Sequence, residues 1–292
     1  MKDAWGRTIE YVRLSLTDAC NFCCPYCRPA EITPQSQTQL LSVDEWMTIL
    51  GAFHHIGVKA VRLTGGEPLL YPHIEELLGR IKESGWFEDI SMTTNGSLLA
   101  SRAQRLKKFG LNRVNISLDS LETEAFATCV GKTGQLESVL DGIRSAINAN
   151  FKSVKINTVL SRYWSDDEVK SLLQYVEKWP VVWRFIEYMP FQGDAFHGPT
   201  FDEWKEQLER VSGGSLTEVH SVYGFGPATY LALPSGKAVG FIFSMSHSYC
   251  DTCNRVRLTS DGQMRLCLLR DDEADLVSVS YTHLTLPTKA QV

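Results

Sequence analysis

Three cysteines stand close together near the start of the chain: Cys20, Cys24 and Cys27. Their spacing, C-x3-C-x2-C, allows three thiolates to bind three irons of a 4Fe-4S cube and leaves the fourth iron without a protein ligand. Clusters that only transfer electrons normally have four protein ligands. An open iron can bind a small molecule, so the motif predicts catalysis. The alternatives are buried structural thiols and a zinc knuckle, although zinc prefers four ligands.

A second group of three cysteines lies near the other end of the chain: Cys250, Cys253 and Cys267. The spacing, C-x2-C-x13-C, fits a second 4Fe-4S cluster with an open iron, and zinc with a ligand from outside the chain is the alternative. Arg255 and Arg257 alternate on one side of a short predicted strand beside this group. Guanidinium groups match phosphate oxygens well, so the pair indicates a phosphate-bearing ligand. Ordinary surface ion pairs are the competing interpretation.

Composition places further bounds on the protein. The chain has 292 residues, 43% hydrophobic and 22% charged, which is typical of a soluble globular protein with a sizeable core. Its net charge of −5 gives no reason to expect binding to nucleic acid. No apolar run is long enough to span a membrane, and the N-terminus lacks the hydrophobic segment of a signal peptide. We therefore expect a cytoplasmic protein, in which clustered cysteines indicate metal rather than disulfides.

Short apolar segments alternate with amphipathic ones along the first two thirds of the chain. The segments that predict strands are Tyr11–Leu16, Ala60–Leu63, Asp89–Met92, Arg113–Ser117, Ser153–Val159 and Val182–Ile186. Those that predict helices are Val43–His55, Ile74–Glu83, Leu98–Phe109, Leu136–Asn148 and Asp166–Lys178. Such alternation predicts an α/β fold with a parallel sheet and right-handed crossovers. Six strands are fewer than the eight of a closed TIM barrel, so we expect an incomplete (β/α)6 barrel.

The pattern changes after Pro190. A helix is expected over Phe201–Val211, and short strand-like pieces follow between Leu216 and Phe243. We therefore divide the chain into a partial barrel (1–195) and a smaller α+β extension (196–278) that lies across the barrel mouth and carries the second cysteine group. Residues 279–292 resemble the translation of a sequencing adapter, and we expect them not to be native.

Polar motifs follow three of the predicted strands: Thr64–Pro68, Thr93–Gly96 and Ser117–Asp119. Each alone reads as a turn or a helix cap. The carboxyl ends of parallel strands meet at one edge of a sheet, where ligands bind. The first cysteine motif follows the first strand, so four successive strand ends predict one site.

The first cysteine motif, with an aromatic residue before its last Cys, resembles the signature of the radical S-adenosylmethionine (SAM) superfamily. In that superfamily the open iron chelates the amino and carboxylate groups of SAM. One electron then breaks the sulfonium bond and releases a 5'-deoxyadenosyl radical. The Gly-Gly-Glu-Pro motif that begins at Gly65 resembles the superfamily's contact with the SAM amino group.

Two three-cysteine sites on one chain make the resemblance narrower. The sequence resembles the GTP 3',8-cyclase family of molybdenum-cofactor biosynthesis from about Trp5 to Val277. The similarity rests on the segments Gly6–Ile9, Tyr11–Phe22, Arg62–Leu70, Thr93–Gly96, Ser117–Leu121, Lys155–Val159, Arg184–Pro190 and Cys250–Leu258. It implies an enzyme that abstracts the ribose C3' hydrogen of GTP and joins C3' to C8 of guanine.

The resemblance also implies roles for individual residues. Cys20, Cys24 and Cys27 would hold the SAM-cleaving cluster, and Cys250, Cys253 and Cys267 a second cluster that binds guanine. The residues expected to contact SAM are Tyr26, Gly66, Ser117 and Met189. Those expected to contact GTP are Arg13, Arg62, Thr93, Lys155, Arg255, Val256 and Arg257. Among all of these, catalysis is expected to depend most on the first three cysteines and on Arg255 and Arg257.

The implied cofactors are two 4Fe-4S clusters and SAM, and the implied partners are GTP, a flavodoxin- or ferredoxin-like electron donor and a second copy of the chain. One alternative is another radical SAM enzyme with an auxiliary cluster, such as a peptide-modifying maturase. Such enzymes usually carry more cysteines in the C-terminal part. The other is a non-catalytic iron–sulfur or zinc scaffold, which would not cleave SAM.

The C-terminal end yields a testable expectation. Members of the resembled family continue past their last cysteine and end in a glycine-rich segment that reaches the active site. We expect that replacing residues 279–292 with such a segment raises turnover, measured as product formed per chain. An unchanged rate would contradict this.

Overall fold

The structure is a computed structural model of the chain and describes residues 6–27, 40–190, 198–219, 225–267 and 273–276. Its strands are β1 (Tyr11–Ser15), β2 (Ala60–Thr64), β3 (Asp89–Thr94), β4 (Arg113–Ser117), β5 (Ser153–Val159), β6 (Val182–Ile186), β7 (Thr217–Glu218), β8 (Thr229–Ala232), β9 (Ala238–Ile242), β10 (Arg255–Leu258), β11 (Gln263–Arg265) and β12 (Glu273–Asp275). Its α-helices are α1 (Val43–His55), α2 (Ile74–Ser84), α3 (Ala103–Lys108), α4 (Thr123–Val130), α5 (Leu136–Asn148), α6 (Asp166–Lys178) and α7 (Phe201–Ser212). Two short 3₁₀ turns are η1 (Pro68–Leu70) and η2 (Cys250–Thr252).

The six predicted strands are confirmed as β1–β6, with ends that differ from prediction by at most two residues. The predicted helices α1, α5 and α6 have the expected bounds, and α2 and α7 each extend one residue further. At the start of α1 the Ser42 hydroxyl accepts a hydrogen bond from the Glu45 N–H (3.3 Å), and the Glu45 carboxylate accepts one from the Ser42 N–H (2.8 Å). This is a capping box, which satisfies donors that a helix start leaves open.

Two helices differ from expectation. The predicted helix at Leu98–Phe109 begins only at Ala103, because the preceding residues form turns. In these turns the N–H of Leu99 bonds to Gly96 and that of Arg102 to Leu99, three residues back rather than four. The helix α4 was absent from the expected segments.

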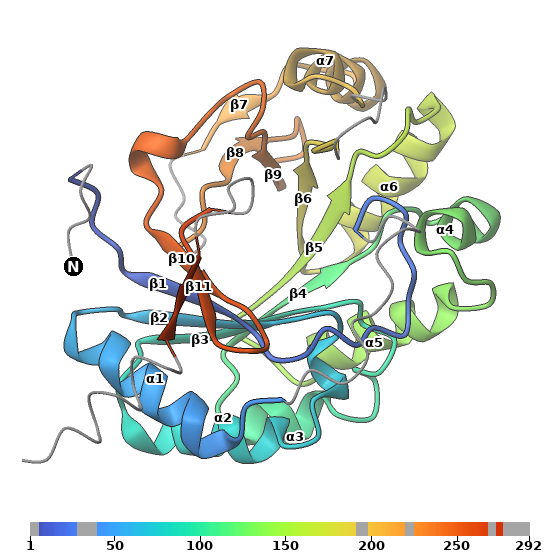
Figure 1. The fold of residues 1–292 in the computed structure, drawn as a ribbon. Coiled ribbons are helices and arrows are strands. Elements are labelled where there is room, and N and C mark those ends of the chain that lie inside the picture. Colours follow the sequence, from blue (N-terminus) through green and yellow to red (C-terminus); the bar gives the residue numbers. More distant parts are fainter. Residues whose placement is uncertain (1–5, 28–39, 191–197, 220–224, 268–272, 277–292) are drawn as a thin grey trace, which may run out of the picture.

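The strands form one twelve-stranded sheet in the order β12-β11-β10-β1-β2-β3-β4-β5-β6-β9-β8-β7 (Figure 1). Parallel pairing extends beyond the six barrel strands, because β10 pairs with β1 and β9 pairs with β6. The ends of the sheet, β12 and β7, are not paired with each other in the part of the chain that the structure describes, so the barrel is incomplete. The C-terminal strands therefore lengthen the barrel sheet at both edges. The boundary between the two predicted domains stays a prediction.

The chain crosses between the two edges once in its C-terminal part. After β9, which lies beside β6, residues 243–254 lead to β10, which lies beside β1. This connection contains Cys250 and Cys253. Two cysteines of the second group thus lie on the segment that joins the two edges of the parallel sheet, and the third, Cys267, follows β11.

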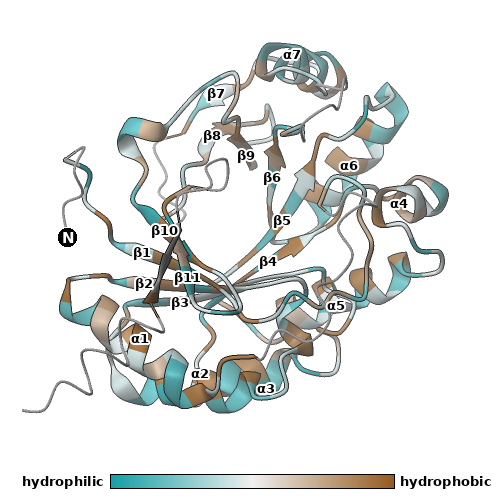
Figure 2. Cartoon of the chain, in the orientation of Figure 1, coloured by the Kyte–Doolittle hydropathy of each residue, from teal (hydrophilic) through white to brown (hydrophobic). Residues whose placement is uncertain are grey.

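The hydrophobic core lies between the sheet and the helices around it. Each of the strands β1–β6 has one apolar face, represented by Val12 and Leu14 on β1 and by Trp183 and Phe185 on β6, and these residues pack with buried side chains of the helices. Figure 2 shows hydrophilic and hydrophobic residues together on α1, α2 and α3, as expected of helices with one buried face. Within the described ranges, no helix combines the length and apolar character that crossing a bilayer requires.

Candidate active site

The inner face of the barrel is polar. Residues that alternate with the apolar core positions share one face across the sheet by register, and they include Arg13, Arg62, Ser91, Asn115, Lys155 and Arg184. Ordinary TIM barrels fill this space with branched apolar side chains. Here charged and polar side chains occupy these positions, which indicates that the lumen holds a polar ligand.

Four arginines form a row across neighbouring strands. Arg265 on β11 is opposite Arg257 on β10, Arg257 is opposite Arg13 on β1, and Arg13 is opposite Arg62 on β2. Like charges in directly opposed positions destabilise a sheet. Burial, and next the charge of Arg257, lower the pKa of Arg13 well below the usual arginine value. The arrangement gains stability when an anion lies among the guanidinium groups.

Two buried polar atoms without a hydrogen-bond partner belong to residues on the inner face of the barrel. Arg13 Nε and Thr93 Oγ1 are buried and have no hydrogen-bond partner among the described residues. A buried donor without a partner costs free energy, and a polar ligand in the lumen would supply the missing partner. Both residues were predicted to contact the substrate.

Lys155 and Arg184 place basic side chains on the far side of the lumen. Lys155 is 4% exposed, and burial, followed by the charges of Arg184 and Arg113, lowers its pKa to about 6. Arg184 is buried and donates to the side-chain oxygens of Asn157 (2.6 Å) and Asn115 (2.7 Å). Burial is the main cause that lowers the pKa of Arg184 to about 10.

The sequence reasoning gave no role to Arg184 or to its two asparagines. All three lie at positions that alternate with the mainly apolar, buried residues of their strands. A polar residue on the otherwise unused face of a buried parallel strand is unusual, and this signal could have identified the three residues from the sequence.

The loop after β2 packs directly on the segment that leads to the first cysteines. Gly66 N–H donates to Thr17 O (2.6 Å), and Glu67 N–H donates to Ala19 O (2.8 Å). A Cβ at Gly66 would lie 2.2 Å from Ala19 O, and one at Gly65, whose φ is +149°, would lie 2.5 Å from Thr17 O. Because no side chain fits at either position, the two glycines allow the close approach of these backbones.

Glu67 ties this loop to the end of β3. Its carboxylate is fully buried and accepts hydrogen bonds from Thr94 Oγ1 (2.8 Å), Asn95 N (2.7 Å) and Leu69 N (3.0 Å). Burial raises the pKa of Glu67, and the bond from Asn95 opposes that shift. Asn95 in turn donates to Asn21 Oδ1 (2.8 Å) and lies 3.9 Å from Cys20 Sγ. Three strand ends are therefore connected beside the first cysteine.

The remaining predicted SAM contacts lie at neighbouring strand ends. Ser117 is the last residue of β4 and is half-buried, and half-buried Met189 follows β6. Tyr26 lies between Cys24 and Cys27, and its hydroxyl donates to Asp119 Oδ2 (2.6 Å). Burial raises the pKa of Asp119 to about 6. Asp119 belongs to the predicted motif Ser117–Asp119, but no role was predicted for its carboxylate.

The first three cysteines fit a cluster that needs anionic ligands. Burial, then Asp119, and then the neighbouring thiols Cys27 and Cys20 raise the pKa of Cys24 well above the usual thiol value. Thiolates so close together repel one another, and bound iron removes that cost. Within the described ranges, no three His, Cys, Asp or Glu side chains gather as they would around one ion. A cube binds its thiolates at separate irons.

The second cysteine group lies beside Arg255, two residues before Arg257 of the arginine row. Burial acts to raise the pKa of Cys253, but the charge and hydrogen bonds of Arg255 outweigh it and the pKa is lowered. Arg255 also lies over the Tyr249 ring, 5.2 Å from its centre. A cavity of about 300 Å³ adjoins the group and is lined by Phe225, Gly226, Pro227, Thr252, Cys253, Asn254 and Arg255. The stabilised thiolate of Cys253 and the adjoining cavity fit an iron–sulfur cluster open to a ligand.

One predicted contact has a different geometry. Val256 lies between Arg255 and Arg257, and strand alternation turns its side chain to the opposite face, where it is 1% exposed within the hydrophobic core. Contact between Val256 and a ligand in the lumen would therefore involve its backbone.

Comparison with known proteins agrees with this arrangement. The radical SAM superfamily model matches residues 14–176, and the model described as Molybdenum Cofactor Synthesis C matches residues 181–283. The GTP 3',8-cyclase of Marinobacter nauticus is 39% identical over 100% of this chain and 88% of the relative. That of Pelotomaculum thermopropionicum is 40% identical over 94% of this chain and 86% of the relative.

The chain belongs to the GTP 3',8-cyclase family. Solved structures share its fold at lower identity. Streptococcus suis SuiB bound to S-adenosylmethionine superposes with a TM-score of 0.68 at 17% identity, covering 94% of this chain and 66% of SuiB. Methylornithine synthase superposes with a TM-score of 0.52 at 18% identity, covering 70% of this chain and 62% of the synthase. The fold class expected from the sequence, an incomplete barrel with a C-terminal extension, is confirmed.

A substitution at Gly66 tests the close packing of the first cysteine loop. In this family member, Gly66→Ala should displace the segment before Cys20, because the new Cβ would overlap Ala19 O. We expect bound iron after anaerobic reconstitution to fall toward that of one cluster. Gly79→Ala is the matched control, because its Cβ would meet only Phe109 at an ordinary 3.5 Å. Full iron content in Gly66→Ala would contradict the packing argument.

Proposed function

We propose that the protein is a GTP 3',8-cyclase that uses SAM and two 4Fe-4S clusters to convert GTP into 3',8-cyclo-7,8-dihydroguanosine 5'-triphosphate. The observation that carries the proposal is the row of Arg265, Arg257, Arg13 and Arg62 between the two cysteine groups. GTP carries several negative charges on one flexible chain, and this row offers guanidinium groups to match them. The curated relatives named GTP 3',8-cyclase support the same substrate.

The residues of the chain divide the work between binding and alignment. Arg13, Arg62 and Arg257 neutralise the triphosphate, and Lys155 and Arg184 supply charge from the opposite wall. This anchoring presents the ribose to the first cysteine loop and the guanine to the second. Fixing both ends of the substrate lowers the entropic cost of the reaction and keeps water from the reacting carbon.

The clusters and SAM would supply the radical chemistry that side chains cannot. Cys20, Cys24 and Cys27 would hold the first cluster, and Cys250, Cys253 and Cys267 the second. Overall, the hydrogen of ribose C3' would pass to the 5'-deoxyadenosyl group of SAM, with methionine as the leaving group, and C3' would join C8. The reaction would use two electrons from the donor, one to cleave SAM and one, with a proton, to complete the dihydro product.

The resemblance also supports partners that the chain alone does not identify. We propose a flavodoxin- or ferredoxin-like electron donor, a homodimer and a cytoplasmic location. A reducing compartment suits the exposed cysteines Cys23, Cys27 and Cys250.

Replacement of Arg257 tests the substrate. Arg257→Ala should weaken GTP binding by about 10-fold to 100-fold, since a hydrogen bond to a charged group contributes about 1.5–3 kcal/mol. It should not lower the melting temperature of the empty protein, because it removes one member of a row of like charges. The exposed Arg80→Ala is the control.

Binding can be followed by the change that GTP causes in the electron paramagnetic resonance (EPR) spectrum of the reduced protein, with iron and zinc contents measured on the same sample. Unchanged GTP affinity in Arg257→Ala would contradict the proposal and favour a peptide substrate. Zinc in place of iron, or no cleavage of SAM, would favour a scaffold.

The lowered pKa of Lys155 predicts a proton linked to binding. At pH 8 the empty protein holds Lys155 mostly as the neutral amine, because its pKa is about 6. A bound polyanion raises that pKa, so GTP binding should take up a proton. Affinity should therefore rise as pH falls from about 10 and level off below about 6.

Calorimetry at pH 8 in buffers of different ionisation enthalpy measures this uptake, at a pH where phosphate groups with a pKa near ~6 are already ionised. Lys155→Met should abolish the uptake, and the exposed Lys170→Met should not. Equal uptake in Lys155→Met and in the unaltered protein would contradict the assignment.

A further inference from the structure

Asp119 connects three loops through one carboxylate. It lies just after β4 and is 3% exposed. Its Oδ2 accepts a hydrogen bond from the Tyr26 hydroxyl (2.6 Å), and its Oδ1 accepts one from the backbone N–H of Val159 at the end of β5 (2.8 Å). The loop of the first cysteines, the end of β4 and the end of β5 therefore meet at this side chain.

The bond to Asp119 acts on the second half of the cysteine loop. The first half is attached elsewhere: Cys23 N–H donates to Val130 O (2.9 Å), and Asn21 bonds to Asn95. Tyr26 lies between Cys24 and Cys27, whose backbones form a turn with a bond of 2.9 Å. A shift of the Tyr26 ring would move both of these cysteines.

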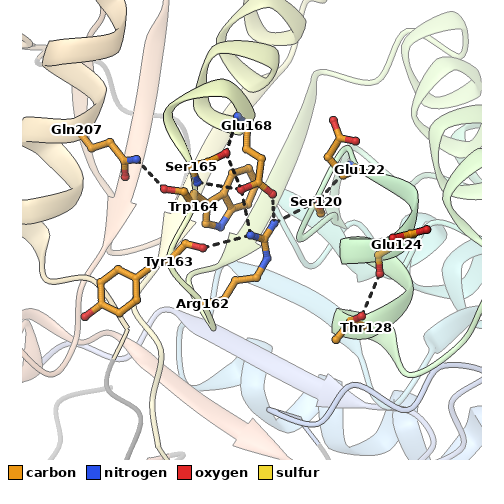
Figure 3. Close-up of polar contacts among 10 residues, drawn as sticks. All are labelled: Ser120, Glu122, Glu124, Thr128, Arg162, Tyr163, Trp164, Ser165, Glu168 and Gln207. Carbon is orange, nitrogen blue, oxygen red and sulfur yellow. Dashed lines mark hydrogen bonds and ion pairs between the residues drawn. The ribbon is translucent and has the colours of Figure 1, made fainter.

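Charged groups beside Asp119 hold its loop in place without bonding to its carboxylate. Figure 3 shows Arg162 directed at Glu168, with Ser120 close by. The Arg162 guanidinium donates to both oxygens of Glu168 (2.6 and 3.2 Å) and to Ser120 Oγ (3.4 Å). Glu168 also closes the capping box of α6 with Ser165. Arg162 is thus held by Glu168, which leaves the oxygens of Asp119 to Tyr26 and Val159.

We propose that Asp119 is a positioning residue for SAM, which holds Tyr26 and the Cys24–Cys27 turn against the ends of β4 and β5. The proposal rests on the SAM site of the proposed function and does not depend on GTP. A buried carboxylate that accepts a hydrogen bond from a loop tyrosine fixes that loop more firmly than a neutral acceptor would. Hydrogen bonds to charged groups are stronger than those between neutral groups. Residues that orient cluster ligands in this way influence affinity without touching the metal.

The test compares Tyr26→Phe, Asp119→Asn and the double variant. Tyr26→Phe removes only the hydroxyl, and Asp119→Asn keeps an oxygen that can accept from Val159. Tyr163→Phe, at a tyrosine that is 64% exposed, and Asp141→Asn, at an exposed aspartate on α5, are the matched controls. SAM affinity is read from the change in the EPR spectrum of the reduced first cluster as SAM is added, with iron content and GTP affinity measured on the same samples.

We expect each single variant to weaken SAM binding by roughly 10-fold, the lower end of the effect of removing a residue that orients metal ligands. The double variant should be no weaker than the singles, because both changes break one contact. Iron content and GTP affinity should match those of the controls.

Three results would overturn the proposal: unaltered SAM affinity in Tyr26→Phe, effects of the two single changes that add in the double variant, or a parallel loss of GTP affinity that indicates general damage. If Asp119→Asn does not fold, Tyr26→Phe alone decides between these outcomes. An unaltered protein that binds SAM but not GTP would refute the proposed function and leave this test valid.

Discussion

The repulsion among arginines inside the barrel shapes the rest of the structure. Arg265, Arg257, Arg13 and Arg62 oppose one another across four neighbouring strands, where sheets ordinarily avoid like charges. The arginine row therefore contributes little to holding the barrel together. The main stabilising layer is the outer face, where residues such as Val12 and Trp183 pack against the surrounding helices. The protein separates a stabilising apolar layer from a functional charged one by the two-residue alternation of its strands.

The charged inner face also lies close to both cysteine groups. The polar contacts at the strand ends, centred on Glu67 and Asp119, arrange the first group. Cys250 and Cys253 of the second group lie on the connection that brings Arg255 and Arg257 to the strand beside β1, and Cys267 follows the neighbouring strand β11. Neither part of the chain supplies the whole positive row, since Arg13 and Arg62 come from the first part and Arg257 and Arg265 from the second.

The sequence predicted the individual helices and strands better than the way in which the strands pair in the sheet. Local patterns sufficed for β1 to β6, because each strand and its following helix are defined by residues close in the chain. The pairing of β10 with β1 joins residues more than two hundred positions apart, and no local pattern contains it. The roles of Arg184, Asn115 and Asp119 were missed for a related reason, since each becomes meaningful only when strands lie side by side. Cysteine spacing was informative because the ligands of one cluster lie close together in the chain, so their pattern is visible in the sequence itself.

The pairing of β9 with β6 and of β10 with β1 has a consequence for how this protein can be divided. Cut free at the end of the barrel strands, the first part would expose two bare parallel edges with unpaired backbone groups, which invite aggregation. The C-terminal strands cover both edges, one on each side. The C-terminal part, which the sequence suggests is an appended module, therefore also protects the edges of the sheet. Loss of β9 or of β10 would leave one edge covered and the other exposed, and the exposed edge would allow self-association.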